Sequence, residues 1–390
     1  MLDGKGMSTN REYIPFGRPS FSQAEIDAVT AVMRKGWVGM GPETLAFEKE
    51  LAAYLGVPHV VTLNSCTSAL HLALLTSGVE EGDEVICPSL TWCSTANAAL
   101  YVGATPVFCD VNPHSLCMDA ESVLAQVTTK TKAVVVVHYG GYPVDVEAIR
   151  KVLPAGIKII EDAAHALGAL HEDGKKVGSS GNPTCFSFYA NKNLATGEGG
   201  AIALTDEEQA NRIRVLRQHG LPVDAWMRYT HPKNMLLSNH LTELGFKMNY
   251  TDLQASIGRV QLARYEEFQF IRRSIAKIYF ENLSVRFSGI RFQDLILSPR
   301  HALHLFVIQL PENISHSREN LILQLRNRNV GATIHYTPLH TMPLYNKGGD
   351  EIPALVQVDR LERKILTLPI SASMSEEDAY YVVRQIEEVL

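Results

Sequence analysis

The middle of the chain alternates short apolar runs with segments of helical periodicity. Seven apolar runs lie at 59–63, 83–87, 105–110, 133–138, 157–161, 185–188 and 201–204. Helical patterns at 67–76, 95–102, 120–127 and 144–153 separate most of them. Strands that are apolar along nearly their whole length are buried on both faces, and parallel strands need helical crossovers. The pattern predicts an α/β fold with a mostly parallel seven-stranded sheet covered by helices.

The segment before these strands is predicted to be helical. The segments after them are predicted to be helical and then to form a separate small domain. Ser22-x-x-Glu25 is a capping box that predicts a helix through Ile26, Val29 and Met33, followed by a second helix at 44–55. Beyond the sheet, helices are expected at 207–218 and from about 251 to 268, with irregular chain between them. The remainder predicts a small α+β domain with strands at 303–310 and 332–336 and helices at 317–328 and 375–390. The expected organisation is a flexible leader at 1–12, a large domain at 13–265 and a small C-terminal domain at 266–390.

Composition narrows the class of protein. The net charge of −6 argues against a protein that coats nucleic-acid phosphates. Six cysteines are scattered without any Cys-x-x-Cys pair, which favours reduced thiols in a cytoplasm over disulfides or zinc. No apolar run approaches the ~18 residues of a membrane span, and no signal-peptide core is present near the N-terminus. We expect a cytoplasmic protein with no nucleic-acid partner and no membrane insertion.

Two charged residues stand where strands end. Lys192 follows the run at 185–188 and precedes the glycine-rich 197–200, and Asp162 directly follows the run at 157–161. In parallel sheets chemistry collects beyond the carboxyl ends of the strands. A lysine and an aspartate in such positions suit pyridoxal 5′-phosphate (PLP), whose aldehyde forms a Schiff base with lysine and whose pyridine nitrogen is held protonated by a carboxylate. The competing interpretations are a surface lysine and a solvated strand-end charge, and the second is reasonable for the neighbouring Glu161.

Further residues fit the other parts of this cofactor. The turn at 64–70 joins a strand to a helix, and its hydroxyls, among them Thr67 and Ser68, would bind a phosphate at the helix N-terminus. Ser187 is an additional phosphate donor by its proximity to the lysine. Trp92 is the candidate for stacking on the pyridine ring, and His165 for a hydrogen bond near the phenolic oxygen. The alternatives are an ordinary N-cap for the turn, a packing tryptophan, and a core histidine.

A second group of candidates lies farther from the cofactor motifs. His335, Tyr336 and His340 end a predicted strand of the small domain, and a substrate-facing or structural role is expected for them. Two histidines five residues apart with no third ligand nearby do not predict a metal site. Trp37 lies in the glycine-rich break at 36–42, which is a turn that could also line the mouth of a ligand site.

Together these motifs resemble the DegT/StrS family of PLP-dependent nucleotide-sugar aminotransferases, over residues 14–390. The resemblance is strongest at residues 64–70, 88–95, 137–139, 161–166, 187–200 and 248–252. The stretches 64–67, 88–92, 161–165 and 219–225 are most similar to the UDP-4-amino-4-deoxy-L-arabinose aminotransferase branch. Tyr189, Asn191 and residues 337–339 depart from that branch.

The resemblance implies the aspartate aminotransferase (type I) fold and a role for each motif. It implies Lys192 as the Schiff-base lysine and Asp162 as the partner of the pyridine nitrogen. It implies Trp92 on the ring, His165 near the phenolic oxygen, and phosphate contacts from Thr67, Ser68 and Ser187. It also implies that Asn249 reaches the phosphate bound by a neighbouring subunit, so that the active unit is a homodimer with shared sites.

The implied activity is transfer of an amino group from L-glutamate to a nucleotide-linked keto-sugar, with 2-oxoglutarate released. The similar branch favours a UDP-4-keto sugar used for surface polysaccharide or lipid A. A PLP-dependent sugar dehydratase is the first alternative, although that branch has histidine in place of Lys192. A non-catalytic sugar-binding regulator would have no need for both Lys192 and Asp162. A general amino-acid aminotransferase would need an arginine for the substrate carboxylate.

Overall fold

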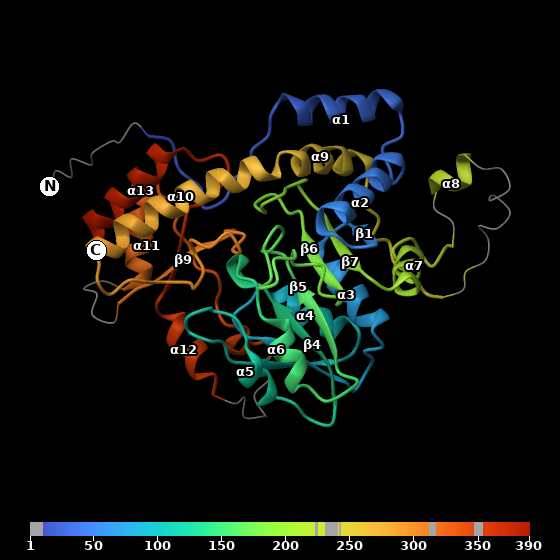
Figure 1. The fold of residues 1–390 in the computed structure, drawn as a ribbon, viewed down its shortest axis with the longest axis horizontal. Helices are drawn as coiled ribbons and strands as arrows, with labels where there is room; N and C mark the ends of the chain where they lie inside the picture. Colours follow the sequence, from blue (N-terminus) through green and yellow to red (C-terminus); the bar gives the residue numbers. More distant parts are fainter. Residues whose placement is uncertain (1–10, 223–224, 231–240, 242, 312–316, 347–353) are drawn as a thin grey trace.

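A seven-stranded sheet forms the centre of the larger part of the molecule (Figure 1). The computed structural model describes residues 11–222, 225–230, 241, 243–311, 317–346 and 354–390. The strands are β1 (His59–Leu63), β2 (Glu84–Pro88), β3 (Thr105–Cys109), β4 (Thr131–Val137), β5 (Lys158–Asp162), β6 (Thr184–Ser187) and β7 (Gly200–Leu204). All seven expected strands are confirmed, with ends shifted by at most two residues. Their order is β1-β7-β6-β5-β4-β2-β3, and β7 alone runs antiparallel to its neighbours.

Both faces of this sheet are buried, as the apolar runs predicted. On β7, Ile202 and Leu204 belong to one hydrophobic cluster, whereas Ala201 and Ala203 belong to another. Successive side chains of a strand point to opposite faces, so the two clusters are the two sides of the sheet. The first contains most of α3 (Cys66–Thr76), and the second contains Phe47 and Leu51 of α2 (Pro42–Leu55).

Helices connect and cover the strands. The remaining helices of this region are α4 (Cys93–Tyr101), α5 (Ala120–Leu124), the 3-10 turn η1 (Tyr139–Gly141), α6 (Val146–Val152), α7 (Glu207–Leu216) and α8 (Ala225–Thr230). The region between 218 and 251 is therefore not irregular throughout, since α8 lies within it.

At the N-terminal side, α1 (Gln23–Lys35) begins at the predicted capping box of Ser22 and Glu25 and lies along α9 (Asp252–Ala263) (Figure 1).

The C-terminal part has its own sheet and core. Strands β8 (Arg291–Phe292), β9 (Phe306–Gln309) and β10 (Ile365–Leu368) form a sheet in the order β10-β9-β8. Helix α13 (Glu376–Val389) packs against both the long helix α10 (Tyr265–Arg286) and α11 (Arg318–Asn327), and Figure 1 shows this group at the opposite end of the molecule from α7. A hydrophobic cluster runs through these helices and strands. The 3-10 turn η4 (Leu339–Thr341) and α12 (Val356–Glu362) complete this part.

Two sequence predictions about this part were wrong. The helix expected from about 251 to 268 is instead two helices, α9 and α10, which meet at Arg264, and α10 continues to Arg286. Within α10, buried Arg272 donates through Nη1 to the carbonyls of Leu303 and Ile370. The strand expected at 332–336 is absent from the described residues, where only Thr333 forms an isolated bridge with Thr367. The proposed domain boundary at 265/266 falls at the start of α10, and residues 1–10 of the proposed leader lie outside the described residues.

None of the described helices combines the length and apolar character needed to cross a membrane. The six cysteines are all free, and five of them are buried.

Candidate active site

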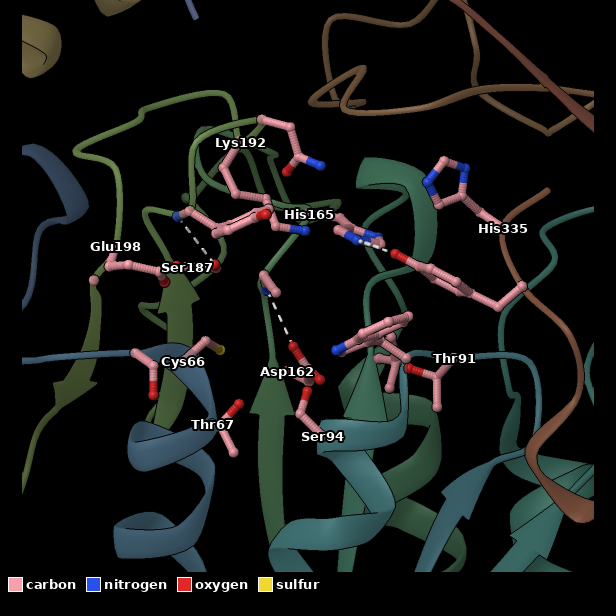
Figure 2. Close-up of a pocket in the computed structure, with 18 of the residues that line it drawn as sticks. Cys66, Thr67, Thr91, Ser94, Asp162, His165, Ser187, Lys192, Glu198 and His335 are labelled. Atoms are coloured by element: carbon pink, nitrogen blue, oxygen red, sulfur yellow. Dashed lines mark hydrogen bonds between the residues drawn. The ribbon is translucent and has the colours of Figure 1, made fainter. Parts of the chain in front are cut away.

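A cavity of about 520 Å³ opens at the carboxyl edge of the large sheet (Figure 2). Its walls include the turns that follow β1, β2, β5 and β6. Phe16 from the N-terminal segment and the pair His335 and Tyr336 from the C-terminal part complete the lining. Segments distant in sequence therefore converge where strand-end chemistry was expected.

Lys192 reaches into this cavity from the loop after β6 (Figure 2). Its backbone N–H donates to the Tyr189 carbonyl at 2.9 Å, which tightens the loop that carries it. Its Nζ lies 3.4 Å from Nε2 of His304. Burial lowers the pKa of Lys192 from 10.5 to about 8, although Cys66 and Asp162 oppose the shift. A lysine in this state is a competent nucleophile and proton carrier near neutral pH.

Asp162 ends β5 and faces the same cavity. Its Oδ2 accepts a hydrogen bond from the Thr95 hydroxyl at 2.7 Å, and its Oδ1 accepts one from the Ala164 N–H at 3.1 Å. Burial raises the pKa of Asp162, and these two hydrogen bonds oppose the rise. A carboxylate in this state is stabilised further by any cation placed against it, such as a protonated pyridine nitrogen.

The turn after β1 brings hydroxyls and the N-terminus of α3 to the wall of the cavity. Ser65 caps α3 by accepting from the Ser68 N–H at 3.1 Å, and Ser65, Cys66 and Thr67 all line the cavity. Gly200 on β7 packs against this turn so closely that a Cβ there would lie 2.5 Å from the Cys66 nitrogen. This contact places Ser187, at the end of β6, on the same side of the cavity as the α3 N-terminus (Figure 2). Hydroxyls and helix N–H groups suit a phosphate, so the donor set fits PLP.

His165 is held as a neutral imidazole beside the lysine. Its Nδ1 accepts from the Gly140 N–H at 3.2 Å, so its Nε2 carries the proton and donates to the Tyr336 hydroxyl at 3.1 Å (Figure 2). Burial lowers the pKa of His165 well below its ordinary value, and nearby Lys192 adds to this effect. His165 thus lines the cavity as an uncharged ring whose one N–H is bonded to Tyr336.

Most of the site residues expected from the sequence meet in this cavity. Those that line it are Thr67, Trp92, Asp162, His165, Ser187, Lys192, His335 and Tyr336. The indole of Trp92 is 59% exposed and lies 5.6 Å, centroid to centroid, from the Tyr336 ring.

Four expected residues are placed elsewhere in the single chain. Ser68 donates to the Asn64 side chain instead of lining the cavity. Trp37 and Asn249 both line a second cavity of about 390 Å³. His340 bonds to Ser89 through Nδ1 at 2.7 Å and to Asp359 through Nε2 at 3.0 Å, which indicates a structural role.

Several residues of the site were missed by sequence reasoning. Thr95 holds Asp162, His304 contacts Lys192, and Phe16 lies 5.0 Å from the His335 ring. Thr95 and His304 lie in ordinary helical and strand-like patterns and give no local signal of function. Phe16 lies ahead of the first predicted helix, and only its pairing with the C-terminal part places it here, through a hydrogen bond from the Ile370 N–H to its carbonyl.

Glu161 is buried rather than solvated. It accepts hydrogen bonds from His138 Nε2 at 2.8 Å, from Asn182 Nδ2 at 2.7 Å and from the Ser180 hydroxyl. Because His138 Nδ1 accepts from the Val144 N–H, the imidazole is neutral and donates through Nε2. Glu161 therefore fixes the end of β5 from the side opposite the cavity. Within the described ranges, no cluster of three or more histidine, cysteine, aspartate or glutamate side chains is arranged to hold a metal ion.

The fold, with a buried lysine and aspartate facing one cavity beside a helix N-terminus, is that of a PLP-dependent enzyme. Comparison with known proteins identifies the group more closely. The chain belongs to the DegT/DnrJ/EryC1/StrS aminotransferase family, whose sequence profile matches residues 19–387. Its cofactor is pyridoxal 5′-phosphate.

Relatives match along nearly the whole chain. The spore coat polysaccharide biosynthesis protein SpsC of Bacillus subtilis is 40% identical over 382 residues, covering 97% of each chain. The crystal structure of the aminotransferase TlmJ from Streptoalloteichus hindustanus has a TM-score of 0.86 at 34% identity, with 96% of this chain and 98% of TlmJ covered. The PLP form of a protein from Streptococcus pneumoniae, assigned as a sugar aminotransferase, has a TM-score of 0.88 at 29% identity and covers 97% of this chain and all of its own.

Proposed function

We propose that this enzyme transfers the amino group of L-glutamate to a keto-sugar linked to a nucleoside diphosphate, with 2-oxoglutarate as the other product. The observation that carries the proposal is that Lys192 and Asp162 face one cavity that also contains an anion site. The resemblance to the UDP-4-amino-4-deoxy-L-arabinose aminotransferase branch favours UDP and a C4 ketone. The polysaccharide function in the name of SpsC supports a surface-polysaccharide or lipid A sugar pathway, and the free cysteines suit a cytoplasmic enzyme.

Several side chains of the cavity have roles in the proposed reaction. Bound PLP supplies an electron sink for the carbon that loses or gains the amino group. Lys192 anchors the cofactor and then moves the proton at that carbon, as its lowered pKa allows. Asp162 neutralises the protonated ring nitrogen, and Thr67 and Ser187, with help from Ser65, hold the phosphate.

The remaining contacts orient the ring. Trp92, whose side chain is exposed, would stack on one face of it, and His165 would lie near the phenolic oxygen. Both residues line the same cavity as Lys192. A cofactor fixed at its phosphate, nitrogen and ring face has little freedom to rotate, which keeps the reacting carbon near Lys192.

A second subunit completes the site in this proposal. Among the described residues that line the cavity, Lys192 is the only lysine or arginine, and Glu198 carries a negative charge near the anion site. A doubly charged phosphate therefore needs further donors. Asn249 lies outside the cavity of its own chain, beside Trp37 in the second cavity, which suits a contact with the site of a neighbouring subunit. The enzyme is accordingly a homodimer with shared sites.

The sugar lies against the wall formed by Phe16, Tyr189, His335 and Tyr336 in this proposal. His335 is fixed by a 3.0 Å hydrogen bond between its Nδ1 and the Thr367 hydroxyl, and its ring packs against Phe16. Aromatic and neutral polar groups suit a sugar ring.

The decisive test is the visible absorption spectrum of the purified protein before and after addition of L-glutamate, with D-glutamate as the control. A PLP band that shifts to the pyridoxamine form only with the L isomer supports the assignment and the donor. A panel of UDP-, dTDP- and GDP-linked keto-sugars then identifies the acceptor by return of the original band. A PLP band indifferent to L-glutamate would favour a dehydratase-like enzyme or another donor, and absence of any band after PLP addition would favour a sugar-binding regulator.

A further inference from the structure

A relay of hydrogen bonds fixes the ring of His304 next to the lysine. The side-chain Nδ2 of Asn193 donates to the Ala302 carbonyl at 2.7 Å, which sets the orientation of the amide. Its Oδ1 then lies 3.2 Å from Nδ1 of His304. Because an amide oxygen can only accept, His304 Nδ1 must carry the proton. In a neutral ring Nε2 is then an unprotonated acceptor.

The surroundings of His304 keep the ring neutral. Its side chain is almost wholly buried, and Asn193 is buried with it. The ring of His165 lies 4.4 Å away, centroid to centroid, and packs on it at an interplanar angle of 35°. Burial lowers the pKa of His304 well below its ordinary value, and the charges of Lys192 and Arg272 lower it further. A positive charge on His304 would be unfavourable in this buried site next to Lys192. The ring therefore stays neutral at physiological pH, and Nε2 keeps its lone pair.

We propose that His304 is a positioning residue that holds Nζ of Lys192 through its Nε2 lone pair, with Asn193 fixing the tautomer that makes this possible. Nζ lies 3.4 Å from Nε2, and an ammonium or amine N–H is the donor that faces this acceptor. The inference deepens the proposed function, because it rests on Lys192 being the lysine that binds PLP. None of the motifs in the sequence pointed to His304 or to its pairing with Asn193.

The expected consequence is a change in the proton affinity of Lys192. The ionisable groups that face Nζ are Cys66, Asp162, His165, His304 and His335. Burial keeps both of the other histidines neutral, so Cys66, Asp162 and the His304 lone pair are the groups that favour the ammonium form. An ammonium is a stronger hydrogen-bond donor than an amine, so loss of the His304 acceptor should lower the pKa of Lys192 by about one unit.

The test measures the pKa of Lys192 in full-length protein freed of PLP, by competitive acetic anhydride labelling across pH and mass spectrometry of the peptide that contains Lys192. His304→Leu removes the acceptor, whereas His304→Gln retains one through its Oε1. Asn193→Leu removes the acceptor that fixes the tautomer of His304, and it leaves the His304 ring beside Nζ in place. His301→Leu is the matched control, because His301 is a buried histidine three residues away that bonds to Gln293 and the Leu303 N–H instead of Lys192.

The proposal is supported if His304→Leu and Asn193→Leu lower the pKa of Lys192 while His304→Gln and His301→Leu leave it near the wild-type value. It is overturned if His304→Leu leaves the pKa unchanged, or if His301→Leu lowers it equally, since that would indicate general loosening. Nitrogen-15 NMR of histidine-labelled wild-type protein needs no variant. It should show His304 protonated at Nδ1 alone, and protonation at Nε2 would also overturn the proposal. None of these readouts depends on turnover, so the glutamate test of the proposed function can fail or succeed independently.

Discussion

The hydroxyl of Thr95 donates a 2.7 Å hydrogen bond to the carboxylate of Asp162, and so joins α4 to the end of β5 across 67 residues of sequence. Thr95 is fully buried and is itself 3.0 Å from the Thr91 hydroxyl. The carboxylate is thereby fixed in orientation and kept ionisable in a buried position. Thr95 is a positioning residue for the proposed partner of the pyridine nitrogen.

Replacement of Thr95 by valine should weaken PLP binding. The isosteric change removes a hydrogen bond to a charged group, so the dissociation constant should rise by about tenfold or more. Absorbance titration of the cofactor-free protein with PLP measures the effect. Thr95→Ser retains the hydroxyl and should stay within about threefold of wild type. Equal affinities for the valine and serine variants would contradict the role assigned to this contact.

Lys192→Ala should abolish turnover while leaving the fold and non-covalent PLP binding in place. Loss of a positioned proton carrier typically costs about 10²–10⁴-fold in rate, and loss of the covalent anchor adds to this. Steady-state amino transfer, with circular dichroism as the check on folding, measures the outcome. Lys175→Ala is the control, because Lys175 is an exposed lysine that pairs only with Asp173 among its described contacts. Normal turnover by the Lys192 variant would refute the assignment.

Covalent attachment of PLP to the cofactor-free protein should accelerate as the pH rises through about 8, rather than through 10.5. Only the unprotonated amine is nucleophilic, and burial lowers the pKa of Lys192 to about 8. Stopped-flow absorbance across pH gives the midpoint. In competitive labelling, Lys175 should titrate above its ordinary pKa, because Asp173 stabilises its ammonium form. A midpoint for Lys192 near that of Lys175 would contradict the environment described for Lys192.

Glu161→Gln should destabilise the protein by about 1–3 kcal/mol without changing the midpoint for PLP attachment. The new amide N–H₂ would face one of the donors His138, Ser180 or Asn182, so a buried donor would lose its acceptor. Burial alone would raise the pKa of Glu161, but these hydrogen bonds hold it below the ordinary 4.5. The carboxylate therefore stabilises the fold above pH 4.5, and this contribution is lost as the pH falls.

Urea unfolding at pH 7 and at pH 4 measures this contribution. The difference in stability between wild type and Glu161→Gln should shrink at the lower pH. Glu147→Gln, at an exposed pair with Arg150, is the control and should change stability by at most about 0.5 kcal/mol. A Glu161 variant as stable as the control would show that the buried network contributes little.

Mixed dimers should reveal whether the sites are shared. A purified heterodimer of one Lys192→Ala subunit and one Asn249→Ala subunit would contain one intact site if Asn249 serves its neighbour. Such a heterodimer should show about half of the wild-type activity, because a two-fold dimer has two equivalent sites. If Asn249 instead served its own chain, both sites would be damaged and no activity would be regained. The two homodimeric variants provide the baseline.

The sequence by itself determined the strands and the chemistry of the strand ends. Apolar runs buried on both faces favour a covered, mostly parallel sheet, so the positions of β1 to β7 followed from periodicity, although the antiparallel direction of β7 did not. Lys192, Asp162 and Thr67 were identifiable because strand ends in such a sheet share one edge. These inferences depend only on residues a few positions apart in the sequence, because apolar periodicity is a local property of the chain.

The tertiary structure decided what required contacts between distant segments. Thr95 on α4 contacts Asp162, His304 just before β9 contacts Lys192, and Phe16 lines the cavity, yet the local patterns of all three are those of ordinary core or loop residues. The burial of Arg272 on α10 is accompanied by hydrogen bonds to two carbonyls that are remote in sequence. The tautomers of His165 and His304 were likewise set by partners at Gly140 and Asn193, because a hydrogen-bond network is a property of three-dimensional neighbours rather than of sequence spacing.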